Sequence, residues 1–174
     1  MKHLVMLGAG HAHVHLLSTL AAQPMAGVQV TLVAPFPRQM YSGMVPGFVA
    51  GHYALEDCVI PLAPLLEKSA VTWLARNAVG MDASARTLTL DDGSTLTYDV
   101  LSVNSGPVQD RQKIEQMMPG ARANALFVRP IEAFGALWPQ VIELSQGRAL
   151  RVAVVGGGAA GIELACAAAY RLQG

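Results

Sequence analysis

The sequence predicts an α/β protein built on a parallel sheet, with a small antiparallel β-hairpin element attached to it. A glycine turn follows an apolar strand twice, at Gly8-Ala9-Gly10 and at Gly156-Gly157-Gly158. Each turn leads into a helical pattern, and the first helix leads into another β-branched strand, which is the order of a βαβ unit. Further along the chain, Asp92-Gly93 separates two short alternating segments, which is a strong hairpin signal.

The elements can be assigned in chain order. Lys2–Leu7 is a short apolar strand, a helix runs from about His11 to Gln23 before Pro24, and Val28–Val33 is the next strand. A Pro/Gly-rich loop should then span Pro35 to Gly51. The remaining predicted elements are a helix near Pro61–Ser69, strands near Val71–Val79, Thr87–Leu90, Thr95–Tyr98 and Val100–Val103, a polar linker Pro107–Arg122, a helix near Pro130–Gln146, a strand Leu150–Val155 and a last helix after the second glycine turn.

Composition excludes several classes of protein. The chain has 174 residues, 52% hydrophobic and 14% charged, with 12 basic and 12 acidic residues and no net charge. It is too apolar to be disordered, and it lacks the basic excess of a nucleic-acid-binding protein. Two distant cysteines exclude a disulfide scaffold. No Asp, Glu, Lys or Arg lies between residues 3 and 37, but histidines, Gln23 and Pro24 interrupt this run, so neither a membrane span nor an export signal is predicted. We therefore expect a cytoplasmic protein.

The glycine turns carry the chemistry. In such a turn the first glycine makes the tight bend and the second lets the backbone approach a pyrophosphate, which the helix N-terminus then attracts. The segment 156–161, GGGAAG, fits the full G-x-G-x-x-G pattern after an apolar strand. The first turn has His13 in place of the third glycine. An imidazole at that position must point away from the packed strand, and one direction open to it is toward the ligand.

Other candidate residues have simpler explanations. His11, His13 and His15 form an H-x-H-x-H string, but they do not share one face of a helix, so no metal site is predicted. Cys58 and Cys166 form no C-x-x-C pair, and Cys166 is expected to be a buried apolar residue. The acid that usually binds ribose hydroxyls, about 20 residues after the turn, is replaced by Ala34. The equivalent segment after the second turn would lie beyond Gly174, so NAD and NADP both stay open.

The chain resembles the two-dinucleotide flavoprotein disulfide reductase superfamily, in its branch similar to type II NADH dehydrogenases. Within that branch it is most similar to the pyridine nucleotide oxidoreductases associated with selenide, water dikinase. The strings that carry the resemblance are GAGHAHVHLL (8–17), YSGMVPGFVAGHY (41–53), VGMDASARTLTLDDGSTLTYDVLSVNSG (79–106) and VRPIEAF (128–134). The resemblance implies a Rossmann-like FAD/NAD(P)-binding fold. Members are roughly twice this length, so the chain is expected to be an N-terminal portion.

The resemblance also implies positions for two cofactors. The positions implied for FAD are Gly8, Gly10, His11, His13, Ala34, Arg38, Ser42, Met44, Val79, Ser105 and Gly106, and those implied for NAD(P) are Gly156, Gly158, Gly161 and Glu163. The implied domains are the N-terminal part of an FAD-binding domain at 1–110, a linker at 111–128 and the start of an NAD(P)-binding domain at 129–174. No catalytic side chain is expected, since the cofactors carry the chemistry.

The implied activity is hydride transfer from NAD(P)H to FAD, followed by electron transfer to a quinone or another small-molecule acceptor. The resemblance leaves open a homodimer and peripheral membrane contact in a longer protein. Two other hypotheses remain at this point. The chain is a dinucleotide-binding module without turnover, or it is a dimeric structural unit whose apolar surface is covered by a second copy.

Overall fold

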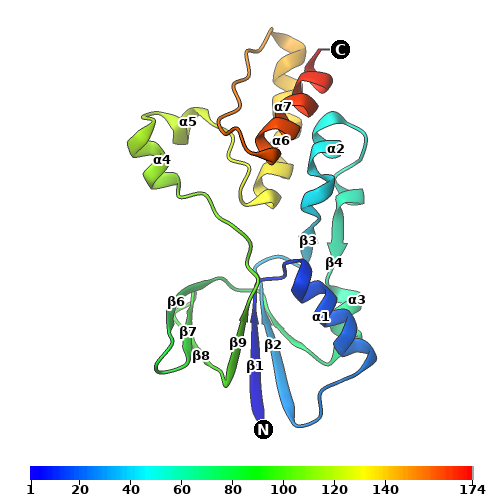
Figure 1. Ribbon diagram of the computed structural model, residues 1–174, viewed down its shortest axis with the longest axis vertical. Helices are drawn as coiled ribbons and strands as arrows, with labels where there is room; N and C mark the ends of the chain where they lie inside the picture. Colours follow the sequence, from blue (N-terminus) through cyan, green and yellow to red (C-terminus); the bar gives the residue numbers. More distant parts are fainter. Residues whose placement is uncertain (174) are drawn as a thin grey trace. The chain divides into compact units, whose positions relative to one another are not determined.

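A computed structural model describes residues 1–173 of the chain (Figure 1). Its contacts group the residues into two compact units. Unit 1 contains Met1–Gln39 and Ile60–Gly106, and unit 2 contains Met40–Val59 and the residues from Pro107 onward. Each unit has its own buried core, so each is described by itself.

Unit 1 is built on a four-stranded parallel sheet of order β5-β2-β1-β9. Its strands are β1 (Lys2–Leu7), β2 (Val28–Val33), β5 (Thr72–Leu74) and β9 (Val100–Val103). Helix α1 (His11–Ala22) carries the chain from β1 to β2 and packs against α3 (Ala63–Ser69). The predicted first βαβ unit is therefore confirmed, with its parallel register running from Lys2 opposite Val28 to Leu7 opposite Val33.

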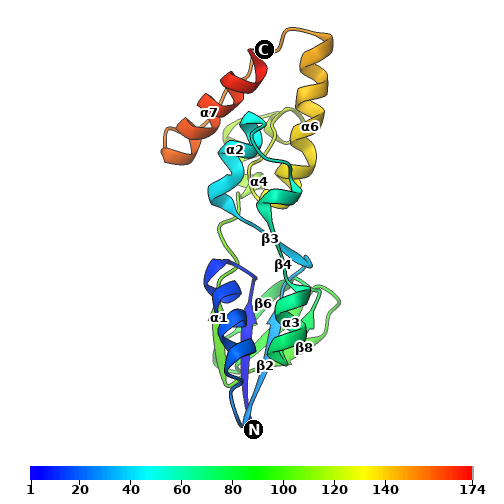
Figure 2. The same cartoon turned by 90° about the vertical axis from the view of Figure 1, so that its right-hand side faces the viewer.

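The parallel sheet is buried on both faces, which explains why its strands are almost continuously apolar. Met6 and Leu32 pack against Leu17 of α1 on one face. On the other face, Val5 and Val33 pack against Leu88 and Leu90 of a small antiparallel sheet. Figures 1 and 2 show α1 and α3 on one side of the strands and this small sheet on the other.

The antiparallel sheet has the order β6-β7-β8, with β6 (Ala78–Asp82), β7 (Thr87–Leu90) and β8 (Thr95–Thr97). The predicted turn joins β7 to β8, and Gly93 supplies its left-handed residue at φ +82°. Asp91 accepts hydrogen bonds from Asn77, and Asp92 accepts from Ser94. The two carboxylates thus stabilise the turn and its neighbouring loop.

Unit 2 is mainly helical. A two-stranded sheet of β3 (Arg38–Met40) and β4 (Val59–Pro61) lies where the chain passes between the units. The short helix α2 (Val45–Ala50) packs with α6 (Ile131–Gly147) and α7 (Ala159–Leu172) around buried Phe48, Trp138 and Leu164. The remaining elements are the 3-10 turns η1 (Ser42–Met44) and η2 (Glu56–Cys58) and the helices α4 (Arg111–Met117) and α5 (Ala121–Asn124).

Three sequence predictions fail in unit 2. The expected loop 35–51 contains β3, η1 and α2, and the expected linker 107–122 contains α4, which begins where Asp110 accepts a hydrogen bond from Lys113 N at 2.9 Å. The expected strand 150–155 is irregular, and residues 151–160 are all exposed. A strand needs a neighbour to pair its backbone groups, and no parallel sheet lies in the described part of unit 2.

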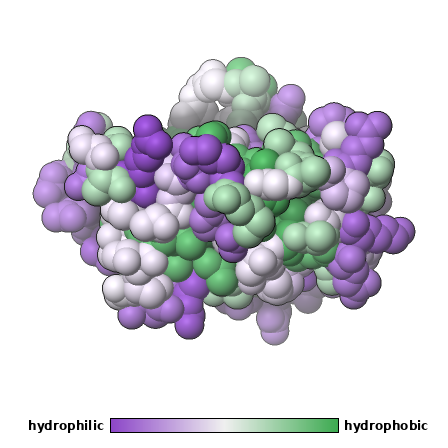
Figure 3. Space-filling view, turned by 90° about the horizontal axis from the view of Figure 1, so that it is seen from below, coloured by the Kyte–Doolittle hydropathy of each residue, from purple (hydrophilic) through white to green (hydrophobic). Residues whose placement is uncertain are grey.

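The exposed surface carries scattered apolar side chains. Seen from below, hydrophobic areas lie between hydrophilic ones (Figure 3). Met1, Met25 and Val100, which precede or begin strands of the parallel sheet, have exposed fractions of 91%, 48% and 58%. Within residues 1–173, no helix has the length and apolar character needed to cross a membrane.

Candidate functional site

The candidate site lies in unit 1, where β1 and β9 end. From β1 the chain passes through α1 to β2 on one side, while β9 pairs with the opposite side of β1. Strand order therefore reverses between β1 and β9. In open α/β sheets, ligands bind outside the carboxyl ends of the strands at such a reversal. Two loops meet there, 8–10 after β1 and 104–106 after β9.

The glycines of the first turn allow these two loops to touch. Gly8 has φ +86°, and a Cβ built on it would lie 2.4 Å from Ser105 Cα. Gly10 has an ordinary φ of −64°, but a Cβ on it would lie 2.2 Å from Asn104 Oδ1 and 2.6 Å from Asn104 O. Both glycines are thus required by the packing of one loop on the other, and the structure brings Gly8 and Gly10 together with Ser105.

Asn104 joins the second loop to the start of α1. Its backbone oxygen accepts a hydrogen bond from Gly10 N at 2.9 Å, and its side-chain Oδ1 accepts one from Ala12 N at 3.2 Å. Sequence reasoning singled out Ser105 and Gly106 but missed Asn104. A polar residue directly after a parallel strand that pairs with the glycine-turn strand was the signal that could have found it.

His13 points into the protein. Its side chain is only 3% exposed, with Nδ1 2.5 Å from Gly8 O and Nε2 2.8 Å from Ser102 Oγ. Because a carbonyl oxygen only accepts, Nδ1 carries the proton and Nε2 accepts from the Ser102 hydroxyl. The sequence left open whether this imidazole faces a ligand or the protein interior, and in the structure it faces the interior. At the third-glycine position the side chain faces β9, and its polar atoms are satisfied there.

The two neighbours of His13 in the H-x-H-x-H string differ from it. His11 and His15 are both exposed on α1. Among residues 1–173, no group of three His, Cys, Asp or Glu side chains is arranged to hold a metal ion.

The position of the missing ribose acid is closed by internal hydrogen bonds. Ala34 is 2% exposed, its N–H donates to Leu74 O at 3.1 Å, and its carbonyl oxygen accepts from Trp73 Nε1 at 2.9 Å. Ala34 therefore offers no carboxylate, and its backbone groups are buried and already hydrogen-bonded within the protein. Trp73 thus donates its indole N–H to the residue that follows β2.

Four other positions that the resemblance implies for FAD belong to other elements of the structure than these two loops. Arg38 is exposed at the start of β3. Val79 lies on β6 with 66% of its side chain exposed. Ser42 and Met44 form η1 of unit 2, where Met44 packs against that unit's core.

The second glycine turn keeps the local geometry of its motif. Gly156 has φ +129°, and a Cβ on Gly161 would lie 2.0 Å from Gly156 O, so the turn folds tightly against the first turn of α7. Ile162 N donates to Gly158 O at 3.1 Å, and Glu163 is exposed on the helix. The strand that should precede the turn is not formed, so only the turn and its helix are present.

The two thiols differ from each other. Cys58 is fully buried and its Sγ lies 3.4 Å from Ala54 O. Burial, helped by the neighbouring carboxylates of Asp57 and Glu56, raises the pKa of the Cys58 thiol, which disfavours a reactive thiolate. Cys166 is exposed, contrary to the sequence expectation that it is buried.

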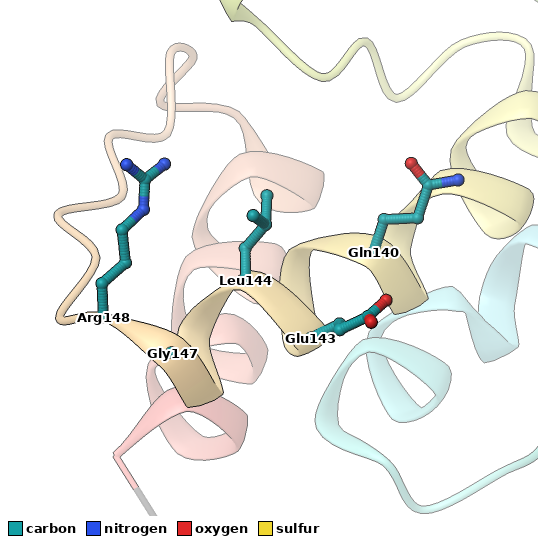
Figure 4. Close-up of a pocket in the computed structure, with 5 residues that line it drawn as sticks. All are labelled: Gln140, Glu143, Leu144, Gly147 and Arg148. Carbon is teal, nitrogen blue, oxygen red and sulfur yellow. The ribbon is translucent and has the colours of Figure 1, made fainter.

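A surface hollow lies in unit 2 at the end of α6 (Figure 4). It is lined by Gln140, Glu143, Leu144, Gly147 and Arg148, which all belong to one stretch of chain and are exposed. Figure 4 shows the side chains of Glu143 and Arg148 extending in different directions. Because no polar groups converge on it, this hollow does not have the character of a ligand site.

Comparison with known proteins places these features in a family. The model of the pyridine nucleotide-disulphide oxidoreductase family matches residues 2–172. The chain is 30% identical over 106 residues to a sulfide-quinone reductase of Aquifex aeolicus. These aligned residues make up 61% of this chain and 24% of that protein. It is also 30% identical to the ferredoxin–NAD(+) reductase component of the p-cumate 2,3-dioxygenase system of Pseudomonas putida, over 97% of this chain and 40% of that protein. The chain thus spans less than half the length of these relatives.

Solved structures share the fold. An NAD-dependent persulfide reductase from A. fulgidus superposes with a TM-score of 0.75 at 20% identity, over 98% of this chain and 32% of that one. The water-forming NADH oxidase of Lactobacillus brevis gives a TM-score of 0.74 at 21% identity, over 98% of this chain and 38% of that one. These likenesses confirm the predicted α/β fold class, which is that of Rossmann-like FAD/NAD oxidoreductases. By its fold and by the match over residues 2–172, the chain belongs to the pyridine nucleotide-disulphide oxidoreductase family.

Proposed function

We propose that this chain binds FAD where β1 and β9 end, as part of a flavin-dependent NAD(P)H oxidoreductase. The observation that carries the proposal is the meeting of a glycine turn, a helix N-terminus and the loop after β9 at the reversal of strand order. Membership of the family supports the same assignment. Hydride transfer from NAD(P)H and onward electron transfer are supplied by the cofactors, while the protein supplies binding and orientation.

The residues present fit the pyrophosphate of FAD. The first turn of α1 contains no acidic residue, and no side chain of the helix's own N-cap occupies its N–H groups. An anion is therefore favoured there by the helix dipole. Gly8, Gly10 and His11 would surround the phosphates, and the exposed Ser105 and Gly106 would face the cofactor from the second loop. His13 would hold the turn in place from behind.

The remaining cofactor positions rest on the family resemblance. Ala34 offers no carboxylate to a ribose, so the adenosine would be held by its phosphates and by neighbours such as Arg38. Ser42, Met44 and Val79 are proposed as flavin and adenine contacts. The NAD(P) site is proposed at Gly156, Gly158, Gly161 and Glu163. The domain boundaries at 1–110, 111–128 and 129–174 are part of the same proposal.

The acceptor is proposed to be a quinone or another small molecule. The similarity to a sulfide-quinone reductase supports a quinone. Since the chain covers 24% and 40% of its two curated relatives, the complete cycle is proposed for a protein of their full length.

A second candidate is a nucleotide-binding module without turnover. It is favoured by the segment 151–160, which is exposed and forms no strand before the second glycine turn. A site that orients nicotinamide needs this strand to place the turn at a sheet edge. In this candidate only the first turn binds a dinucleotide.

The test is uptake of FAD by the purified chain. We expect the protein to show flavin absorbance, or to acquire it on titration with FAD, and the Gly10→Ala variant to lose it. Gly147→Ala is the matched control, because a Cβ there meets no atom within 4 Å. A folded chain that never takes up FAD would refute the binding site. In a protein of the relatives' full length, absence of anaerobic bleaching by both NADH and NADPH would favour the module without turnover.

A further inference from the structure

Helix α7 is apolar on two opposite sides. On one side, Leu164 and Ala167 are buried in the core of unit 2. On the other side, Ile162, Cys166 and Ala169 follow each other at helical spacing and are all exposed. A helix that is apolar all round is ordinarily covered on every side. The outer side of α7 therefore lacks a partner among residues 1–173.

The segment before the second glycine turn adds to this exposed surface. Residues 151–155 are all exposed, and 76% of Val155 is open to solvent. Their backbone groups form no hydrogen bond within the described part of the chain. A β-branched segment without proline and with unpaired backbone groups is a template for pairing with another strand. Because Gly156 O packs against Gly161, the turn keeps the end of this segment beside the first turn of α7.

The two features together form one apolar surface, which we call the outer face of unit 2. It consists of Val152, Val154, Val155, Ile162, Cys166 and Ala169. None of these side chains is charged, so the face has no group that would attract an acidic or a basic partner. The whole chain carries 12 basic and 12 acidic residues, so two copies have no net charge to hold them apart at neutral pH. An identical face on a second copy matches this one in both polarity and charge.

The accessible surface of the chain is large for its mass. It amounts to 10716 Å², whereas a folded protein of 18.3 kDa exposes about 8,100 Å². Even two independent units of half this mass would together expose about 9,800 Å². The excess of about 900 Å² over that value is close to the roughly 800 Å² that each partner contributes to a standard protein interface. A second copy that covers one face of this size would bury the area that a stable dimer needs.

We propose that the chain forms a dimer with a second copy of itself through the outer face of unit 2. Residues 151–155 of the two copies pair as antiparallel strands, and each copy covers the exposed side of the other's α7. A two-fold axis relates the copies, so the interface is self-complementary and assembly ends at two chains. The pairing supplies partners for the backbone groups of the segment. This inference goes beyond the proposed function and does not require FAD, whose glycine turn lies in unit 1.

The first measurement is the mass of the purified chain in solution, by sedimentation velocity over a series of protein concentrations. We expect a shift from 18.3 kDa toward twice that mass as the concentration rises. Val154→Lys and Ile162→Lys each place a charge in the apolar interface, so each should raise the dissociation constant of the dimer at least about tenfold. Both side chains are exposed within one chain, so neither substitution should disturb the fold of unit 2, which Trp138 fluorescence reports.

Val108→Lys is the matched control. Val108 also belongs to unit 2 and is also exposed, but it lies outside the outer face. The same change of valine to lysine at this position should leave the dissociation constant of the dimer unchanged.

The native Cys166 thiol gives a second measurement, because it is exposed and lies on the outer face. Its rate of reaction with Ellman's reagent, expressed per chain, should fall as the protein is concentrated, because the dimer covers the thiol. In Ile162→Lys the rate should stay at its dilute value over the same concentrations. Cys58 is fully buried and does not contribute to this rate.

A dimer that both lysine substitutions in the face dissociate and Val108→Lys leaves intact would support the proposal. A chain that stays monomeric, with a thiol reactivity independent of concentration, would overturn it and leave the face to another protein or to further residues of a longer one. Assemblies that grow beyond two chains, or a dimer that Val154→Lys and Ile162→Lys do not weaken, would overturn it as well. FAD uptake is measured separately, so a dimer that takes up no FAD would refute only the proposed function.

Discussion

Replacing Gly10 by Ala tests whether the two loops of the site pack as the structure shows. The added Cβ would lie 2.2 Å from Asn104 Oδ1 and 2.6 Å from Asn104 O. The side-chain oxygen can rotate away, but the backbone oxygen can move only if the loop after β9 moves. Gly10 has φ −64°, which alanine adopts without strain, so the destabilisation comes from this contact.

The expected cost follows from the contacts that are lost. Two hydrogen bonds, from Gly10 N and Ala12 N, join α1 to Asn104. Each contributes about 1 kcal/mol, and overpacking adds about 1–3 kcal/mol. The free energy of unfolding of unit 1 should therefore fall by roughly 3–5 kcal/mol, less a few tenths gained because alanine restricts the unfolded chain.

Each unit contains one tryptophan, which makes the assay specific. Trp73 lies in unit 1 and Trp138 in unit 2. In a Trp138→Phe background, urea unfolding followed by fluorescence reports on unit 1 alone. Gly147→Ala in the same background is expected to leave the Trp73 transition unchanged. If Gly10→Ala unfolds at the same urea concentration as its parent, the close packing of the two loops is wrong.

Three further outcomes are expected. Ser102→Ala should lower the stability of unit 1 by about 1–3 kcal/mol in urea unfolding, because buried His13 Nε2 loses its hydrogen-bond partner; an unchanged midpoint would contradict the hydrogen bond between His13 and Ser102. The pKa of Asp99 is lowered by a lysine ammonium and a backbone N–H that bind its carboxylate. The stabilisation that the ionised Asp99 carboxylate contributes to folding is present above its unfolded pKa of about 3.9 and is lost as pH falls through the lower folded pKa. Asp99→Asn should therefore make the free energy of unfolding depend less steeply on pH in acid than it does in the wild-type chain. Parallel pH profiles of the two chains would refute this. The Cys166 thiol should react with Ellman's reagent in the native chain and Cys58 only after unfolding; equal rates would refute the burial of Cys58.

The parts of the fold that were predictable are those with local causes. The strand, glycine turn, helix and second strand of residues 2–33 follow each other within one βαβ unit, and each has its own pattern of apolar residues. The hairpin at Asp92-Gly93 has an equally local signal. For these segments, neighbouring residues in the sequence determine the structure, so pattern and turn chemistry were enough.

The failures have causes that lie far away in the chain. The segment 150–155 has the composition of a strand, but its backbone finds no partner strand among the described residues, and residues 151–155 stay exposed. Cys166 lies on a helix whose buried face includes Leu164 and Ala167, and only the packing of α7 decides that the thiol lies outside that face. Most residues of α7 are small or apolar, so its sequence pattern does not indicate which face another helix covers.

For the candidate site, the sequence predicted the first glycine turn but not the contacts around it. The glycine pattern located the turn, yet the atoms that crowd Gly8 and Gly10 belong to Ser105 and Asn104, almost a hundred residues later. Glycine at these positions is therefore required by the fold even without a ligand, so the glycine pattern alone does not demonstrate dinucleotide binding. What distinguishes a binding turn from a structural one is the electrostatic character of the groups around the helix N-terminus. Here the first turn of α1 contains no acidic residue and Asn104 is uncharged, so the positive end of the helix dipole stays available to a negatively charged ligand.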